Sequence, residues 1–244
     1  MDVLFVLDFD GVLFNSAYEA YNVSTHAIRG DDRYRQDVDY EEFLAYRAVV
    51  TDAWQYNRLF SQSDRVPREA LRLVQPTDAD WDFARRFFAA RKALMAEADW
   101  PKSMPPYDFF LRLKPLLIEH SRHFAILSTR NVDSLRQTLA FHDADVIPVF
   151  GQEDIREHGS KIEVARSQGW LDGKDWLTVY VDDMNSHLEP FEGAVHLPLH
   201  ADWGYDKTTL GSLSDHQIMT IIKSLLALAT PGAAADAAAG GADK

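Results

Sequence analysis

The sequence predicts an α/β fold in which helices flank a parallel sheet and an all-helical subdomain is inserted. Short, continuous apolar runs such as Val3–Leu7 and Phe124–Leu127 are typical of strands buried on both faces of a parallel sheet. From residue 105 onward, helical patterns alternate with such runs, as in layered α/β proteins. Residues 15–104 show helical periodicity and no convincing strand. We therefore predict a Rossmann-like core formed by residues 1–14 and 105–228, interrupted by a helical subdomain at 15–104.

The first strand leads directly into a polar turn. Val3–Leu7 is followed by Asp8, Phe9, Asp10 and Gly11. The two carboxylates therefore lie at the carboxyl end of a strand, where open α/β sheets bind their ligands. They are two residues apart, so on extended backbone they point to the same side. Two adjacent and partly buried negative charges are unfavourable unless a cation offsets them, and a hard divalent cation is suited to this.

Within the inserted segment, Asp78–Ala98 gives the clearest helical pattern. One face of this helix is expected to carry Trp81, Ala84, Phe87 or Phe88, Arg91 and Met95. Elsewhere in the segment, Arg47, Trp54 and Tyr56 could contact a substrate. The favoured interpretation is a solvated helix face with a buried aromatic stripe.

The α/β alternation resumes after Pro105 and Pro106. Helices are expected over Tyr107–His120, after an N-cap at Asn131 or Asp133, from Ser160-Lys161 and from Ser214. Further strands are expected at Asp145–Phe150, Leu177–Val181 and Ala194–Leu199. Pro115 should kink or break its helix because proline has no backbone N–H. Gln217 is placed to form a capping box with Ser214.

Composition narrows the classes of function. The chain has 244 residues, 46% of them hydrophobic, which is enough for a sizeable core. Its net charge of −13 argues against nucleic acid and anionic membranes as partners. There is no cysteine, no signal-peptide pattern and no membrane-length apolar run, so we expect a soluble, cytoplasmic protein. Residues 229–244 are rich in Ala and Gly and are expected to form a disordered tail. The sequence does not indicate the oligomeric state.

Polar residues collect at one edge of the predicted sheet. They are Asp8 and Asp10 after the first strand, Ser128 after the second, Asp182 and Asp183 after the fourth, and Lys161 at a helix start on the same edge. Carboxylates without imidazole or thiolate ligands favour Mg²⁺. A hydroxyl, free backbone amides and a lysine are the usual parts of a phosphate site. The pattern predicts metal-assisted phosphoryl transfer.

These residues resemble the four motifs of the haloacid-dehalogenase-like (HAD) superfamily. Asp8-Phe9-Asp10-Gly11-Val12-Leu13 is similar to the first motif, Ser128 to the second, Lys161 to the third and Val181-Asp182-Asp183 to the fourth, in the family's order. The inserted segment lies between the first and second motifs, as in the members that carry a helical cap there. Lys161 is followed by Ile162 where many members have proline, a difference that concerns only the start of the helix.

The resemblance implies catalytic roles. Asp8 would be the nucleophile that forms an aspartyl-phosphate. Asp10 would protonate the leaving oxygen and then activate the water that cleaves the acyl-phosphate. Ser128, Thr129 and Lys161 would hold the transferring phosphoryl group. Members that act as dehalogenases lack an acid at the position of Asp10, so its presence favours a phosphatase or a phosphomutase.

The resemblance also implies a metal site. Mg²⁺ would be bound by the Asp8 carboxylate, the Asp10 carbonyl and an aspartate of the fourth motif. Aligning the strand ends places Asp183 in the direct ligand position and Asp182 further out. Lys161 would offset part of the negative charge around the phosphate.

Three functions therefore remain open. The expected one is a Mg²⁺-dependent phosphatase acting on a small phosphorylated metabolite. The alternatives are a phosphomutase of the same fold and a catalytically silent binding or regulatory protein. His196 and His200 could be taken for a metal pair, but one strand without a third ligand favours a structural role.

Overall fold

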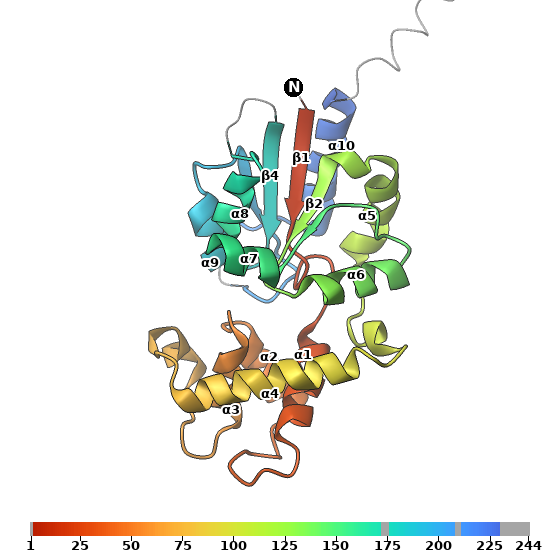
Figure 1. The fold of residues 1–244 in the computed structure, drawn as a ribbon. Coiled ribbons are helices and arrows are strands. Elements are labelled where there is room, and N and C mark those ends of the chain that lie inside the picture. Colours follow the sequence, from red (N-terminus) through yellow and green to blue (C-terminus); the bar gives the residue numbers. More distant parts are fainter. Residues whose placement is uncertain (1, 172–175, 208–210, 230–244) are drawn as a thin grey trace, which may run out of the picture.

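The computed structural model describes residues 2–171, 176–207 and 211–229, and a parallel sheet lies at its centre (Figure 1). The five strands are β1 (Asp2–Leu7), β2 (Phe124–Leu127), β3 (Val149–Phe150), β4 (Trp176–Asp182) and β5 (Leu197–His200). Their order in the sheet is β3-β2-β1-β4-β5, and every pairing is parallel. The first strand is thus the central one, and its end lies at the middle of the sheet edge. The predicted α/β fold class is confirmed.

Helices cover both faces of the sheet. In the described part of the core they are α5 (Asp108–Glu119), α6 (Val132–Phe141), α7 (Gln152–His158), α8 (Lys161–Ser167), α9 (Asn185–Leu188) and α10 (Asp215–Ala229), with short 3-10 turns η4 (Ser121–His123) and η5 (Glu189–Phe191). Alternate residues of β1 point to opposite faces. Val3, Phe5 and Leu7 pack in one cluster with α5, α6 and α10, and Leu4 and Val6 pack in another with α8 and α9. This burial on both faces explains the continuous apolar runs of the strands.

The inserted segment is helical and has a hydrophobic cluster of its own. It contains α1 (Ala17–Ile28), α2 (Tyr40–Arg47), η1 (Ala53–Tyr56), α3 (Asn57–Phe60), η2 (Arg68–Leu73), α4 (Asp78–Leu94) and η3 (Trp100–Ser103). Phe43, Phe60 and Phe83 are fully buried in its cluster. Figure 1 shows α1–α4 beyond the carboxyl ends of the strands. The segment's two connections run side by side, since Asn15 N–H donates to the Pro105 carbonyl at 2.9 Å.

The buried face of α4 differs from the predicted one. Of the residues predicted to share one face, Ala84 and Phe87 are buried but Trp81 is 44% exposed, and α4 ends at Leu94 instead of Ala98. The buried positions are Asp80, Phe83, Ala84, Phe87 and Ala90. Asp80 lies on this face because its carboxylate accepts hydrogen bonds from Asn57 and Arg58 at 2.7 and 2.5 Å. An apolar pattern cannot reveal a buried charge whose partners come from elsewhere in the chain.

Of the kink or break expected at Pro115, the break is wrong, because α5 continues through this residue. Pro115 leaves the carbonyl of Leu111 without its helical partner, but both residues lie on the exposed face of the helix, where water can satisfy that group. The opposite face buries Phe109, Phe110, Leu113 and others against the sheet.

Other boundaries shift by a few residues. β3 is shorter than the predicted Asp145–Phe150, β5 is displaced from Ala194–Leu199 to Leu197–His200, and α7 was not predicted. The capping box at Ser214 is confirmed, with Gln217 Oε1 accepting from Ser214 N–H at 2.8 Å. The predicted disordered tail lies outside the described residues, apart from Ala229, which ends α10. Within the described ranges, every helix is too short or too polar to cross a membrane.

Packing of α5 against the sheet gives a first prediction. Leu113→Ala should lower the free energy of unfolding by about 2–5 kcal/mol, because a fully buried leucine leaves a cavity. Leu111→Ala is the control, since Leu111 is 53% exposed on the same helix, and it should change stability by about 0.5 kcal/mol or less. Urea unfolding followed by circular dichroism measures both, and equal losses would contradict this packing.

Candidate active site

The end of β1 places two aspartates at the middle of the sheet edge. Asp8 N–H donates to the Val181 carbonyl at 2.8 Å, so the β1–β4 ladder extends to Asp8, which is 3% exposed. The backbone then turns back, and Leu13 N–H donates to the Phe9 carbonyl at 3.0 Å. Gly11 permits this turn with a φ of +87°, a conformation that other residues rarely adopt. Asp8 and Asp10 thus lie where the strand ends and the turn begins.

Lys161 connects Asp8 with Asp182. Its ammonium, at the start of α8, lies 3.1 Å from Asp8 Oδ1 and 2.8 Å from Asp182 Oδ2. Ser160 caps this helix by accepting a hydrogen bond from Glu163 N–H, and so helps to fix the position of Lys161. Burial alone lowers the pKa of Lys161, but the charges of Asp182 and Asp8 outweigh it and hold that pKa above its usual value. Lys161 is therefore a permanent positive charge between two carboxylates.

Asp182 is fully occupied by protein donors. Its carboxylate accepts hydrogen bonds from Tyr180 Oη at 2.5 Å and Met184 N–H at 2.9 Å, besides the Lys161 ammonium. His187 Nδ1 lies 3.3 Å away. Burial raises the pKa of Asp182, but the charges and hydrogen bonds of Lys161 and His187 together outweigh it and hold the pKa below its usual range. Asp8, Asp182 and His187 lie close enough to resemble a metal site, but the Lys161 ammonium already contacts both carboxylates.

Asp183 has the opposite environment. Tyr205 N–H donates to Asp183 Oδ2 at 2.5 Å, whereas the buried Asp183 Oδ1 has no hydrogen-bond partner among the described residues. The carboxylate lies between Gly11 and Gly204, and a Cβ on either would come within 2.5 Å of Asp183 atoms. Burial and the charge of Asp182 raise the pKa of Asp183 well above its usual range. A buried, unpaired carboxylate oxygen of this kind fits a divalent cation.

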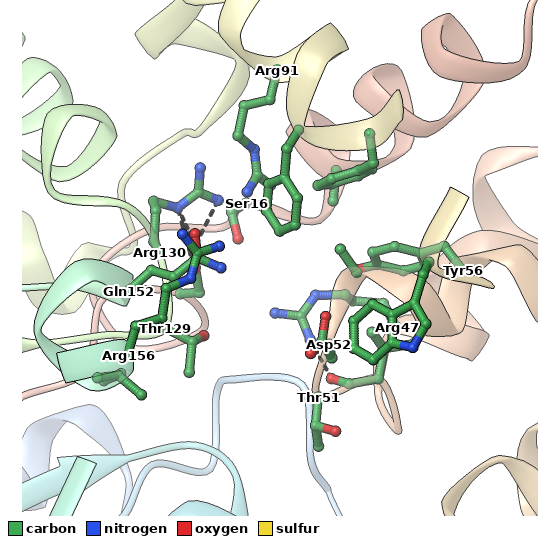
Figure 2. Close-up of a pocket in the computed structure, with 18 residues that line it drawn as sticks. Ser16, Arg47, Thr51, Asp52, Tyr56, Arg91, Thr129, Arg130, Gln152 and Arg156 are labelled. Carbon is green, nitrogen blue, oxygen red and sulfur yellow. Dashed lines mark hydrogen bonds and ion pairs between the residues drawn. The ribbon is translucent and has the colours of Figure 1, made fainter. Parts of the chain in front are cut away.

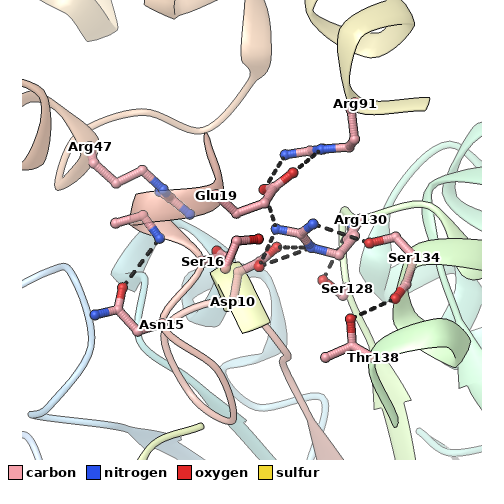
Figure 3. Close-up of polar contacts among 12 residues, drawn as sticks. Asp10, Asn15, Ser16, Glu19, Arg47, Arg91, Ser128, Arg130, Ser134 and Thr138 are labelled. Atoms are coloured by element: carbon pink, nitrogen blue, oxygen red, sulfur yellow. Dashed lines mark hydrogen bonds and ion pairs between the residues drawn. The ribbon is translucent and has the colours of Figure 1, made fainter. Parts of the chain in front are cut away.

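Arg130 is a central residue of the site that the sequence interpretation missed. Its guanidinium is nearly fully buried and donates to Asp10 at 2.8 Å, to Glu19 at 3.1 Å and to Ser134 at 3.1 Å (Figure 3). Glu19, from the inserted segment, also accepts from Arg91 at 2.8 and 2.9 Å. The position of Arg130, two residues beyond Ser128 at the end of β2, is the sequence signal that could have identified it.

Arg130 also sets the charge state of Asp10. Burial raises the pKa of Asp10, but the charge and hydrogen bonds of Arg130 outweigh it and lower that pKa to about 2. Asp10 is therefore ionised in this arrangement at neutral pH.

The structure brings the predicted phosphate-binding residues to the same edge. Ser128 is fully buried, and its Oγ accepts from Arg130 N–H at 3.3 Å. Thr129 lines the same cavity as Asp10. Lys161 contacts Asp8 directly, as described above. His196 Nδ1 accepts from Thr178 N–H at 3.1 Å, which agrees with the structural role expected for this histidine.

A cavity of about 400 Å³ lies between the inserted segment and the core (Figure 2). Its polar lining includes Asp10, Ser16, Arg47, Asp52, Arg91, Thr129, Arg130 and Arg156, and its apolar lining includes Tyr56, Trp81, Phe87 and Phe88. Arg47 was expected on a solvated helix face, and this expectation is wrong, because the residue is partly buried and lines the cavity. Trp54 is buried beside Trp81, with ring centroids 6.4 Å apart, and does not line the cavity.

Comparison with known proteins identifies the fold. No family model and no curated protein sequence matches the chain. Solved structures do match, at low sequence identity. A haloacid-dehalogenase-like family hydrolase from Streptococcus pneumoniae has a TM-score of 0.58 at 13% identity, covering 91% of this chain and 98% of that one.

Two further structures are similar. A predicted phosphoglycolate phosphatase from Haemophilus somnus has a TM-score of 0.60 at 12% identity, covering 91% of this chain and 98% of the other. CbbY from Rhodobacter sphaeroides, in complex with xylulose-1,5-bisphosphate, has a TM-score of 0.57 at 15% identity, covering 87% and 92%. The chain therefore has the fold of the HAD-like proteins, and the resemblance seen in the motifs is confirmed at the level of the fold.

Gly11 gives a prediction about the position of Asp183. Gly11→Ala should destabilise the fold by more than the ~1–2 kcal/mol that a positive φ costs an alanine, because its Cβ would lie 2.3 Å from Asp183 Oδ2. Gly30→Ala is the matched control, since Gly30 has a φ of +72° and open space around its Cβ. Chemical denaturation of both variants measures the difference. A loss at Gly11 no larger than at Gly30 would contradict the close contact with Asp183.

Proposed function

We propose that this protein is a Mg²⁺-dependent phosphatase of the HAD type, which hydrolyses a small phosphorylated metabolite through an aspartyl-phosphate. The observation that carries the proposal is the position of Asp8 at the end of the central strand, with the Lys161 ammonium 3.1 Å from its carboxylate. The structurally similar proteins support it, since they include a predicted phosphoglycolate phosphatase and HAD-like hydrolases.

Asp8 is the nucleophile of the proposed reaction. One of its carboxylate oxygens attacks phosphorus while the bond to the leaving-group oxygen breaks, and an acyl-phosphate forms on Asp8. Water then attacks this phosphorus and releases inorganic phosphate with regeneration of the carboxylate. Lys161, Ser128 and Thr129 hold the phosphoryl oxygens, and Lys161 stabilises negative charge beside Asp8 through both steps.

Asp10 transfers the protons in this scheme, which requires a change in its ion pair. With Arg130 bound and a pKa of about 2, Asp10 carries no proton to donate. An incoming phosphoryl group is itself an anion and competes for the Arg130 guanidinium. Once Asp10 is released, its pKa rises, so that it can protonate the leaving oxygen and later accept a proton from the attacking water.

Oxygen ligands suited to Mg²⁺ are available at this edge. Asp8, Asp183 and the carbonyl of Asp10 would hold the ion, and the unpaired Asp183 Oδ1 supports this assignment. Asp182 would not be a direct ligand, because protein donors already occupy its carboxylate. When bound, Mg²⁺ would supply positive charge toward the phosphoryl oxygens.

The inserted segment would act as a cap. In this proposal residues 1–14 and 105–228 form the catalytic core, and residues 15–104 close over it. The cavity lies between the two and has walls from both, which supports a small substrate enclosed away from bulk water.

Asp8→Asn tests the nucleophile. This change keeps the shape of the side chain and removes its nucleophilic charge, so phosphate release should fall at least about a thousandfold while circular dichroism stays unchanged. Asp37→Asn is the control, an aspartate with a 79% exposed side chain in the inserted segment, and it should retain full activity. The assay is inorganic phosphate release from a metabolite panel with Mg²⁺, and with EDTA as a blank. Substantial activity in Asp8→Asn would refute the mechanism, and an isomerised product without phosphate would indicate a phosphomutase.

The pH dependence of turnover gives a second test. Burial, together with the charge of Asp182, outweighs Lys161 and raises the pKa of Asp8 to about 6. Only the ionised carboxylate is a nucleophile, so kcat/KM should fall as the pH drops below about 6, approaching tenfold per pH unit. A bound cation favours the ionised form, so the fall should move to lower pH as the Mg²⁺ concentration rises. A profile that is flat from pH 5 to 7 at limiting Mg²⁺, with the fold intact, is the contrary outcome.

A further inference from the structure

The cavity is positively charged in a protein that is strongly negative. Four arginines and two aspartates line it, whereas the whole chain carries a net charge of −13. Such a local excess of cations marks a site that receives negative charge. The number of anions it receives depends on which arginines already have carboxylate partners.

Two of the four arginines make ion pairs with acidic residues. Arg91 makes a bidentate pair with Glu19, at 2.8 and 2.9 Å. Arg130 pairs with Asp10 and with the same Glu19. Arg156 makes no ion pair with a described residue, but it is exposed, so water can solvate its charge.

Arg47 makes no ion pair with a described residue, although its charge lies within electrostatic range of Asp10 and Asp183. It is the last residue of α2, and its one hydrogen bond to protein is to the Val50 carbonyl, at 3.2 Å. The guanidinium stacks over the ring of Tyr205, 4.2 Å from its centroid. Figure 3 shows it pointing from the inserted segment toward the side of Ser16 and Asp10. One face of the guanidinium is thus covered, while N–H groups on its edge are free to donate.

We propose that Arg47 binds a second anionic group of the substrate, so that the substrate is a small phosphomonoester carrying a carboxylate or a second phosphate at its other end. This inference rests on the proposed function, because it takes the Asp8–Lys161 edge as the position of the transferring phosphoryl group. A partly buried guanidinium with no carboxylate in contact and without full hydration is unfavourable alone, and an anionic group offsets it. The planar fork of arginine matches both carboxylate and phosphate oxygens.

Tyr205 fixes this guanidinium relative to the reacting edge. Its ring supports Arg47, its backbone N–H donates to Asp183, and its hydroxyl accepts from Ser16 N–H at 2.8 Å. The second anion would therefore be held at a set position relative to Asp183. Between the two ends, Tyr56, Phe87 and Phe88 provide apolar wall for a short carbon chain.

Binding of non-hydrolysable phosphonates tests the proposal without relying on turnover. The probes are ethylphosphonate, whose tail is neutral, phosphonoacetate and 3-phosphonopropionate, which add a carboxylate at two lengths, and propane-1,3-bisphosphonate, which adds a second phosphonate. Isothermal titration in Mg²⁺ buffer gives the affinity of each. The wild-type protein should bind at least one doubly anionic probe about 10- to 100-fold more tightly than ethylphosphonate, as expected for charged hydrogen bonds. The favoured probe identifies carboxylate or phosphate as the second group.

Variants at Arg47 assign this preference to its guanidinium. In Arg47→Gln the ratio of the two affinities should fall to about one, and in Arg47→Lys, which keeps the charge but loses the fork, it should take an intermediate value. Arg85→Gln removes an equal charge from an exposed site on α4 and should leave the wild-type ratio. Should Arg47→Gln fail to fold, the lysine variant carries the comparison.

The outcomes separate this inference from the proposed function. No preference for doubly anionic probes, or a preference equal in wild type and Arg47 variants, would overturn the role of Arg47. Hydrolysis of simple phosphomonoesters would then still support the phosphatase. An Arg47-dependent preference without any phosphate release would support the second-anion site and reject the phosphatase.

Discussion

The Lys161 ammonium lies between the carboxylates of Asp8 and Asp182, and the arrangement of the sheet edge depends on it. β1 and β4 are adjacent, so their ends bring Asp8, Asp182 and Asp183 together in a fully buried position. Three carboxylates this close would repel one another strongly at low dielectric. The Lys161 ammonium between Asp8 and Asp182 offsets part of this repulsion, so β1 and β4 can pair with ionised carboxylates at their ends. Lys161 is the first residue of α8, and Ser160 caps this helix by accepting a hydrogen bond from Glu163 N–H.

Asp182 and Asp183 are neighbours in sequence, but the protein compensates the negative charges of their carboxylates to different extents. Asp182 receives the ammonium, a phenol hydroxyl and a backbone amide, so its charge is well solvated by the protein. Asp183 receives one backbone amide and is enclosed by two glycines. Alternation of side chains along the chain end sends the two carboxylates to different surroundings. Under the proposed function, the carboxylate that lacks compensation is the one that would share a cation with Asp8.

Much of the fold and of this edge could be predicted from the sequence, because both follow from local patterns. Apolar runs specify buried strands, and the residues just after them must lie at the sheet's carboxyl edge, so Asp8, Lys161 and Asp183 needed no tertiary information. Arg130 and Glu19 could not be found in this way. They meet only because the fold brings Glu19 of α1 to Arg130, which lies just after β2. A local sequence pattern shows each of them as an ordinary surface charge. The same holds for Asp80, whose partners Asn57 and Arg58 lie on α3.

The chain of ion pairs through Arg130 gives the inserted segment a role beyond covering the cavity. Glu19 and Arg91 belong to that segment, whereas Arg130 and Asp10 belong to the core, and all four are joined through hydrogen bonds at 2.8–3.1 Å. If the segment moved away, Arg130 would lose Glu19 and keep Asp10 as its remaining carboxylate, so Asp10 would have no competitor for the guanidinium. With the segment in place, Glu19 shares the guanidinium and makes it easier for Asp10 to leave. Under the proposed mechanism, Asp10 can act as an acid only after it leaves Arg130. In this proposal the segment that carries Arg47 would also prepare Asp10 for proton transfer, through the buried Glu19.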